Sequence, residues 1–415
     1  TQGYSSAASD VYKRQDIEVP DADRVYKVGF DTVNAPCSDD ELKTIISRLF
    51  DETSEIRWQS GDAADSKEIL DNTIEMYESE IEKALASDDS GYAELLEESM
   101  RPYVEERKNM DDELPIATEY KINEHYVAEA GGVQRIFMAA SDNEDGDGYN
   151  NYYFTYGMTP EGEDKALVSE VPGTESTYEI NVVGEDTYDG DEKNPITEDE
   201  GLGSAMKLLD NLGISGFACT GTEEAVRAWT GGTYGEDVIK KPDGYRFQFG
   251  RKIDGIDVVY STDIDTVDSI DTDNLTYKGG VDKAVISVDK FGVVSSTVYV
   301  YADEDTFDKE EVKLLSWDEM IKAAGESIAK YYKDHPTNYG TVEFNDVELA
   351  YVPCADESGN KYFVPTWIFS QNEYNEDYRC DMPIQRVYIN AIDGNYIDIV
   401  DNMKKIGMYE ETGRK

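Results

Sequence analysis

The stretch from Trp317 to Val400 decides the fold, and the sequence SWDEMIKAAGESIAKYYKDHP at residues 316–336 opens it. Ser316 and Glu319 have the spacing of a capping box, in which a hydroxyl and a carboxylate satisfy free N–H groups of the first helical turn. Apolar residues then recur at helical spacing: Trp317, Ile321, Ala324, Ile328 and Tyr331. Pro336 is predicted to end this helix, because the residue before a proline is disfavoured in helical conformation.

The residues after this helix have the alternation that is typical of half-buried strands. Three strands are predicted, from Val347, Leu349 and Tyr351, from Phe363, Trp367 and Phe369, and from Val387, Ile389 and Ala391. Pro365 has no N–H for a sheet ladder, so the second strand is expected at an edge or with a bulge. Asp393-Gly394 predicts a hairpin into a fourth strand that contains Ile397 and Ile399. The expected fold class is α+β, with one helix packed on a small antiparallel sheet.

The order of these C-terminal elements, one helix followed by strands, resembles the PepSY-like modules of peptidase propeptides and of cell-envelope regulators such as YycH and YycI. The residues that carry the resemblance are Ser316-Trp317-Asp318-Glu319, Leu349-Ala350-Tyr351, Pro365-Thr366-Trp367 and Ile389-Asn390-Ala391-Ile392-Asp393-Gly394. The resemblance covers the last quarter of the chain well and the last half loosely. It implies non-catalytic inhibition, sensing or ligand binding outside the cytoplasm, and it supplies no catalytic residues.

A looser copy of the same order runs from Thr197 to Tyr301. Thr197 and Glu200 predict a second capping box, before a helix with apolar residues Leu202, Ala205, Met206, Leu209 and Leu212. Alternation in 245–249 and 284–288, followed by a turn at 289–292, predicts strands, and 223–229 is interpreted as a short helix. Duplication is the preferred interpretation, and convergence of two hairpins is the alternative.

Four segments are expected. Residues 1–15 are interpreted as a non-native tail, since Ser9 to Gln15 resembles translated sequencing adapter; an unstructured native tail is the alternative. Residues 16–190 are expected to hold helices followed by an antiparallel sheet, with a short strand at 25–30. Residues 191–310 and 311–405 are expected to form a first and a second PepSY-like α+β module.

Ser38 and Glu41 predict another capping box in the N-terminal segment, before the apolar residues Leu42, Ile45, Ile46 and Leu49. Two further helices are predicted around Leu70–Ala84 and Leu95–Tyr103, and they are expected to pack on the following sheet. Strands are then predicted at 133–139, 152–158 and 178–183.

The chain of 415 residues has a formal net charge of −52, from 90 Asp and Glu against 38 Lys and Arg. Such acidity argues against nucleic acid and anionic lipid as partners, because both select basic surfaces. It is typical of a solvated surface that keeps a secreted protein soluble. No apolar run approaches the roughly eighteen residues that a membrane helix needs.

Histidine and cysteine offer little chemistry. His125 and His335 are the only histidines, which excludes a three-histidine metal site, and no HExxH, GxSxG or Walker-type motif occurs. The four cysteines at 37, 219, 354 and 380 have no close spacing, so free and mostly buried thiols are expected.

Two clusters were weighed as ligand sites. The acidic loop around Asp145 places Asn143, Asp145 and Asp147 like the first ligands of a calcium loop, but Phe154 stands where a glutamate is needed. A hairpin turn is therefore the preferred interpretation of that loop. The tyrosines at 149, 152, 153 and 156 are typical either of a sugar- or peptide-binding surface or of ordinary packing.

These patterns favour an exported cell-envelope protein that acts by non-covalent binding, with no enzymatic activity, cofactor, metal or catalytic residue expected. The expected partners are a peptide, a saccharide or an envelope protein, and a lipid anchor is expected upstream of the available sequence. The alternative is a secreted carboxylate-dependent hydrolase of carbohydrate, which requires a cleft with two facing carboxylates.

Overall fold

The computed structural model describes residues 24–87, 90–108, 114–141, 151–159, 175–180, 193–231, 236–260, 275–334, 344, 346–371, 374–375, 380–381 and 385–411. The predicted non-native tail and the acidic loop around Asp145 lie outside these residues, as does His335. Helices and antiparallel strands occur together, so the predicted mixture of helix and antiparallel sheet is confirmed.

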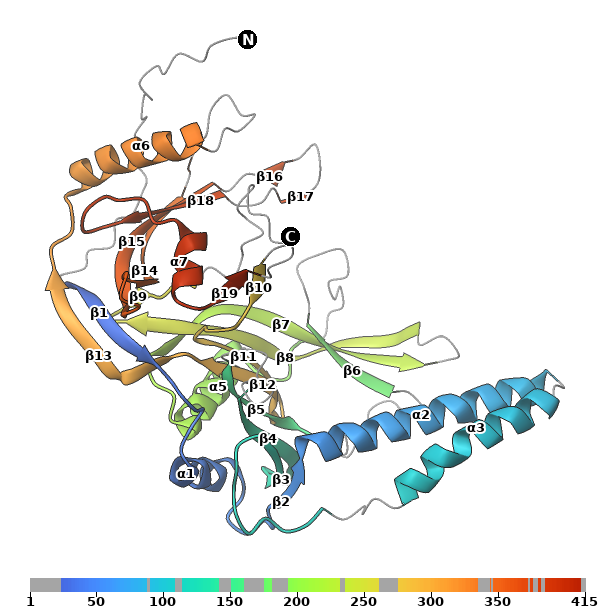
Figure 1. Ribbon diagram of the computed structural model, residues 1–415. Coiled ribbons are helices and arrows are strands. Elements are labelled where there is room, and N and C mark those ends of the chain that lie inside the picture. The colour runs from blue at the N-terminus through green and yellow to red at the C-terminus, as the bar shows by residue number, and fades with distance from the viewer. Residues whose placement is uncertain are drawn as a thin grey trace, which may run out of the picture.

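A ten-stranded antiparallel sheet forms the lower body of the molecule in Figure 1. Its strands, in spatial order, are β2 (Arg57–Ser60), β3 (Glu124–Ala130), β4 (Val133–Ser141), β5 (Tyr152–Met158), β12 (Gly292–Val300), β11 (Lys283–Asp289), β8 (Glu236–Ile253), β7 (Phe217–Gly231) and β6 (Glu175–Ile180), and β9 (Ile256–Asp257) pairs with β8. The predicted strands at 133–139 and 152–158 correspond to β4 and β5, and the turn at 289–292 joins β11 to β12.

Helices α1 (Asp39–Leu49) and α5 (Glu198–Leu212) pack against this sheet in one apolar core. Both capping boxes are confirmed, since Ser38 and Thr197 each accept an N–H from the glutamate three residues later. The predicted apolar side of α1 is buried throughout. On α5, Leu208 is buried in place of the predicted Met206, whose side chain is exposed.

The helix predicted for 223–229 is wrong, because these residues lie within β7. Ala225 and Val226 are buried there, and β7 pairs with β8 along most of its length. The local sequence contains strong helix formers, but long-range hydrogen bonding to a neighbouring strand outweighs such weak local preferences.

Helices α2 (Gly61–Ala86) and α3 (Ser90–Lys108) pack on each other as a hairpin that projects from the sheet (Figure 1). The prediction that they pack on the following sheet is therefore wrong. Their shared core is small and contains Ile81, Ala84 and Ala93, with Leu96 and Met100 packed against it. Each helix has only a narrow apolar stripe, and in the hairpin the two stripes pack on each other. The helices therefore bury these stripes without contacting the sheet.

A second, five-stranded antiparallel sheet forms the upper body of the molecule (Figure 1). Its order is β13 (Ala302–Val312), β1 (Val25–Thr32), β15 (Lys361–Gln371) and β14 (Asp346–Ala355), and β18 (Gln385–Asn390) also pairs with β15. Two short pairs complete the described strands: β10 (Leu275–Tyr277) with β19 (Tyr409–Glu411), and β16 (Tyr374–Asn375) with β17 (Cys380–Asp381).

Helix α6 (Trp317–Asp334) covers one face of this second sheet. Met320 and Ala324 are buried against the side chains that the sequence predicted to share a face, and Trp317 contacts Trp367 with ring centroids 5.3 Å apart. The third capping box is present as well, since Glu319 accepts the Ser316 N–H at 2.9 Å.

Helix α7 (Ile399–Lys405) covers the opposite face, where Ile399 and Met403 pack on Ala350 and Val352. The predicted fourth strand through Ile397 and Ile399 is therefore wrong. Asp398 caps this helix. After the turn at Asp393-Gly394, the chain pairs back with β18 only as an isolated bridge between Ile389 and Tyr396. A sheet that is covered on both faces needs apolar residues on both, and α7 supplies the second set.

The prediction that the strand containing Pro365 lies at an edge or carries a bulge is also wrong, because β15 is central and its register with β14 and β18 is continuous. One side of β15 pairs with β14, while the other pairs with β1 up to Phe363 and with β18 from Thr366. The Pro365 carbonyl accepts the Ala391 N–H on that second side. Proline has no N–H to donate, but Pro365 lies at the point where β18 replaces β1 as the neighbour of β15. The sheet therefore loses few hydrogen bonds there.

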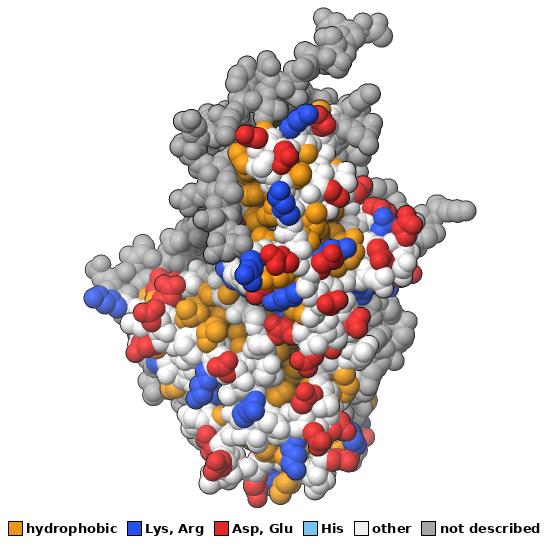
Figure 2. Space-filling model, turned by 90° about the vertical axis from the view of Figure 1, so that its left-hand side faces the viewer, with side chains coloured by type: hydrophobic (Ala, Val, Ile, Leu, Met, Phe, Trp, Pro, Cys, Tyr) orange, Lys and Arg blue, Asp and Glu red, His pale blue; other side chains and the backbone are white. Residues whose placement is uncertain are grey.

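The sheets do not follow the predicted segments. Strands from 16–190 and from 191–310 share the ten-stranded sheet, whereas β1 belongs to the sheet of 311–405. The segment boundaries remain a prediction. Figure 2 shows the face formed around β1, β13 and α6, where acidic and basic side chains are scattered among apolar ones.

Candidate functional site

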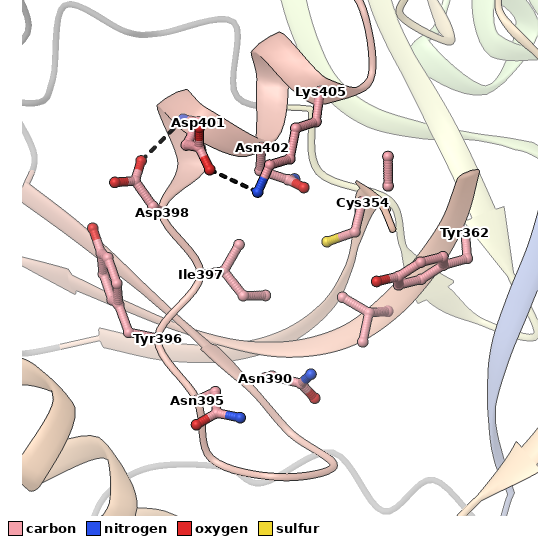
Figure 3. Close-up of a pocket in the computed structure, with 12 residues that line it drawn as sticks. Cys354, Tyr362, Asn390, Asn395, Tyr396, Ile397, Asp398, Asp401, Asn402 and Lys405 are labelled. Carbon is pink, nitrogen blue, oxygen red and sulfur yellow. Dashed lines mark hydrogen bonds and ion pairs between the residues drawn. The ribbon is translucent and has the colours of Figure 1, made fainter. Parts of the chain in front are cut away.

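A pocket of about 300 Å³ lies between α7 and the sheet that it covers (Figure 3). Strands β14 and β15 form one wall, and the segment from the end of β18 through α7 forms the other. Its lining residues are Cys354, Ala355, Tyr362, Val364, Asn390, Asn395, Tyr396, Ile397, Asp398, Asp401, Asn402 and Lys405.

One hydrogen bond caps helix α7, and a second fixes the helix to the strand wall. Asp398 Oδ1 accepts the Asp401 N–H at 3.0 Å, which caps the helix. Asn402 is buried and its Nδ2 donates to the Pro353 carbonyl at 2.6 Å. The helix is thereby held against β14 by a hydrogen bond as well as by apolar packing.

The turn after β18 positions the asparagines of the pocket. Asn390 donates its N–H to the Asn395 carbonyl at 2.8 Å, and its own carbonyl accepts the Gly394 N–H at 2.8 Å. Gly394 has a φ of +77°, and a Cβ there would meet Ala323 Cβ on α6 at 2.4 Å. The predicted Asp393-Gly394 turn is therefore real, and both its backbone conformation and its contact with α6 require glycine.

Cys354 and Tyr362 face each other across the β14–β15 ladder. Burial raises the pKa of the Cys354 thiol to about 12, so it is protonated at neutral pH and is a poor nucleophile. Burial also raises the pKa of the Tyr362 hydroxyl, and the Lys27 ammonium lies 3.8 Å from the centre of the Tyr362 ring.

The charged groups of the pocket are already engaged. Lys405 Nζ pairs with Asp401 Oδ2 at 2.7 Å on the exposed side of α7, and this pairing raises the pKa of Lys405. Asp398 serves as the helix cap. The pocket therefore offers amide and hydroxyl groups above apolar side chains such as Val364 and Ile397. Such an arrangement suits a polar, uncharged ligand held by hydrogen bonds.

The clusters weighed from the sequence lie elsewhere. His125 is on β3 in the other sheet. Tyr156 is buried, and its hydroxyl donates to the Leu49 carbonyl at 3.1 Å, so it is a core residue and not part of a binding surface. Tyr153 packs near Tyr299 with ring centroids 5.6 Å apart. Within the described residues, no group of three or more His, Cys, Asp or Glu is gathered as a metal site.

The expectation of free thiols is confirmed for Cys37, Cys219 and Cys354, but only Cys354 is buried and the other two are half-buried; the side chain of Cys380 lies outside the described residues. Sequence reasoning missed the pocket because it read 397–399 as a strand. A signal was present, however: Asp398 stands at an N-cap position before Ile399, Met403 and Ile406, which recur at helical spacing.

No protein-family model matches the chain, and no curated protein is significantly similar to it. Several solved structures resemble it in part, among them the following two. An uncharacterized protein from Eubacterium rectale matches with 15% identity and a TM-score of 0.33, over 66% of this chain and 75% of that one. The Bacillus megaterium YpeB C-terminal domain matches with 13% identity and a TM-score of 0.23, over 63% of this chain and 87% of that domain.

None of the helices in the described ranges is both long enough and apolar enough to cross a bilayer.

Proposed function

We propose that this protein is an exported cell-envelope protein that acts by non-covalent binding, and that the pocket beside α7 holds its ligand. The observation that carries the proposal is the character of this pocket. It has room for a small ligand, and its hydrogen-bonding groups are held in place by the sheet, the turn and the capped helix. Pre-positioned groups of this kind lower the entropic cost of binding.

The proposed ligand is a saccharide unit or the end of a short peptide. Asn390 and Asn395 provide amides, Tyr362 and Tyr396 provide rings with hydroxyl groups, and the ion pair of Asp401 with Lys405 leaves little net charge. Neutral ligands rich in hydroxyl or amide groups match this lining, because each buried polar group of the ligand needs a partner. A strongly charged ligand has no equivalent partner there.

The alternative hydrolase finds less support in the pocket. A retaining or inverting glycosidase needs two facing carboxylates, one of which has a raised pKa. Asp398 and Asp401 are the carboxylates of the pocket, and their local roles are helix capping and pairing with Lys405. The buried carboxyl with the most clearly raised pKa, Asp289, lies in the other sheet.

A ligand screen on the full chain tests the proposal. Mono- and disaccharides and dipeptides would be screened by ligand-detected NMR, and hits measured by calorimetry. Ala355→Leu narrows the pocket at a half-buried position, and Asn395→Ala removes an exposed amide without disturbing the core. Asn395→Ala is expected to weaken binding roughly tenfold, as is usual for losing one good contact, and Ala355→Leu at least as much, because its larger side chain occupies space needed by the ligand.

The control is Asn72→Ala, an exposed asparagine on α2 outside the pocket, which should leave affinity unchanged. Binding that survives both pocket variants, or the absence of any binding across the panel, would overturn the assignment of this pocket. Fractionation of cells that express the intact gene tests the proposed location in the cell envelope. A cytoplasmic pool of protein without a leader would contradict export.

We also propose that two PepSY-like modules arose by duplication. In the first, α5 precedes β7, β8, β11 and β12, which are successive neighbours in their sheet. In the second, α6 precedes β14, β15 and β18, which are neighbours in the same sequential way. Both helices begin with a capping box. If duplication is correct, sequence profiles of homologues should align 197–301 with 316–400 better than shuffled segments do.

A further inference from the structure

Among the described residues, the α2–α3 hairpin carries most of the large exposed apolar side chains. Seven large hydrophobic side chains are exposed among the described residues, and five of them lie on this hairpin: Met76, Leu85, Tyr92, Leu95 and Tyr103. The other two, Ile116 and Met206, lie apart from it. Scattered single hydrophobic residues are normal on a surface, but concentration on one projecting element marks an interaction site.

Three of these side chains share one side of α3. Tyr92, Leu95 and Tyr103 are separated by three, eight and eleven residues, so at about 100° per residue they fall within about 80° of one another. We call these three residues the α3 apolar face. The surface continues onto α2, because the ring of Tyr103 lies 5.8 Å from that of Tyr77.

The most exposed apolar side chains of the hairpin lie outside the core between α2 and α3. Leu95 is 58% exposed and Met76 is 57% exposed, whereas the hairpin core residue Ala93 is 3% exposed. These large side chains therefore contribute little to holding α2 and α3 together. Docking of a partner would remove their apolar surface from water, which is the main favourable term in protein association.

The charge of the hairpin identifies the chemistry of that partner. Residues 70–108 contain twelve Asp and Glu against four Lys and Arg, a formal net charge of −8. Two of the four cations already pair within the hairpin: Arg107 Nε lies 2.7 Å from Asp71 Oδ1, and Lys83 Nζ lies 2.7 Å from Glu80 Oε1. An apolar face surrounded by excess negative charge complements a positively charged amphipathic segment.

We propose that the α2–α3 hairpin is a docking surface for a basic amphipathic segment of a partner protein. The apolar side of that segment covers the α3 apolar face, and its lysines or arginines pair with the surrounding carboxylates. A second copy of this chain is disfavoured as the occupant, because two such hairpins would bring like charges together. This inference is independent of the pocket beside α7.

A binding assay with a defined peptide tests the proposal on the full chain. The probe is a fluorescent 21-residue peptide of leucine and lysine in a helical pattern, and its binding would be followed by anisotropy. We expect Leu95→Ser to weaken binding about tenfold, and the double variant with Tyr92→Ser, which removes a second member of the α3 apolar face, to weaken it further. Added salt should also weaken binding, because screening reduces the charge contribution.

Matched controls separate docking from general attraction to an acidic protein. Met206→Ser removes an equally large exposed side chain from α5 and should change affinity less than twofold, and a peptide with glutamate for lysine should not bind. Equal affinities of the Leu95→Ser and Met206→Ser proteins for the leucine–lysine peptide would overturn the proposal. So would self-association in sedimentation experiments that Leu95→Ser abolishes, because a second copy would then be the occupant.

Discussion

Arg251 and Asp282 form a buried ion pair, with Arg251 Nε and Asp282 Oδ2 2.7 Å apart. The other oxygen of Asp282 accepts the N–H groups of Tyr301 and Ala302, at 2.8 and 3.3 Å, where the chain passes from β12 into β13. Tyr260 donates its hydroxyl to Asp282 at 2.5 Å. One carboxylate thus fixes an arginine of the ten-stranded sheet to the start of a strand in the five-stranded sheet.

Replacing Asp282 by asparagine should destabilise the protein strongly. Arg251 would keep its buried charge and would retain only the half-exposed Glu304 as an ionic partner, at 3.1 Å. Breaking a buried pair in this way costs about 3–5 kcal/mol of unfolding free energy. Urea denaturation measures the loss. The control is Asp254→Asn, which breaks the exposed pair with Lys309 and should cost less than about 1 kcal/mol. Similar losses in both variants would contradict this account.

Arg227 pairs with Asp243 and Asp289 in a buried cluster, and this cluster should make the stability of the protein depend on pH. Burial raises the pKa of Asp289 from 3.8 to about 6, although Arg227 Nη2 lies 3.1 Å from its carboxylate. A carboxyl with a higher pKa in the folded state binds its proton more tightly when folded. The unfolding free energy that it contributes is therefore greatest at low pH, and it falls as pH rises through this interval.

Urea titrations of the wild type and of Asp289→Asn at several pH values test this sign. The unfolding free energy of the wild type minus that of Asp289→Asn should decline as the pH rises from 3.8 to about 6. Its slope should be at most about 1.4 kcal/mol per pH unit. It should level off above pH ~6, where both states have lost the proton. A flat difference would show that Asp289 has the same pKa in both states.

Gly394→Ala should destabilise the protein more than Gly359→Ala does. Both glycines have positive φ, +77° and +84°, so each alanine would carry a backbone penalty of about 1–2 kcal/mol. Only the alanine at 394 would also meet Ala323 of α6, whereas position 359 has no neighbouring atom within 4 Å. Thermal unfolding of the two variants isolates the contact with α6. Equal melting temperatures would mean that α6 adjusts without cost.

The thiols of Cys37 and Cys354 should react slowly in the native protein. The pKa of each thiol is raised to about 12, mainly by burial, and at Cys37 the nearby carboxylates of Glu41 and Asp39 contribute to this rise. At pH 8 the thiolate fraction should be on the order of a thousandfold lower than for an ordinary thiol, and alkylation follows the thiolate. Mass spectrometry of iodoacetamide-treated peptides, with urea-unfolded protein as control, measures the ratio. Equal labelling before and after unfolding would contradict the expected protection.

Much of the helical structure could be predicted because its signals are local. A capping box needs residues three positions apart, and an apolar stripe needs one or two turns, so Ser38, Thr197 and Ser316 each marked a real helix start. The alternation around Phe247 and Trp367 marked real strands for the same reason. Local patterns also identified the turn at Gly394.

The sequence by itself therefore determined the three helices that begin with capping boxes and the alternating strands around Phe247 and Trp367. Only the tertiary structure decided that β1 joins the C-terminal sheet, that Glu223 lies in a strand, and that α7 covers the second face and closes a pocket at Cys354. It also brought Arg251 to Asp282. Strand partners, second-face packing and buried ion pairs join residues that are distant in sequence. Their free energies depend on the whole assembled fold, so no short window of residues contains them.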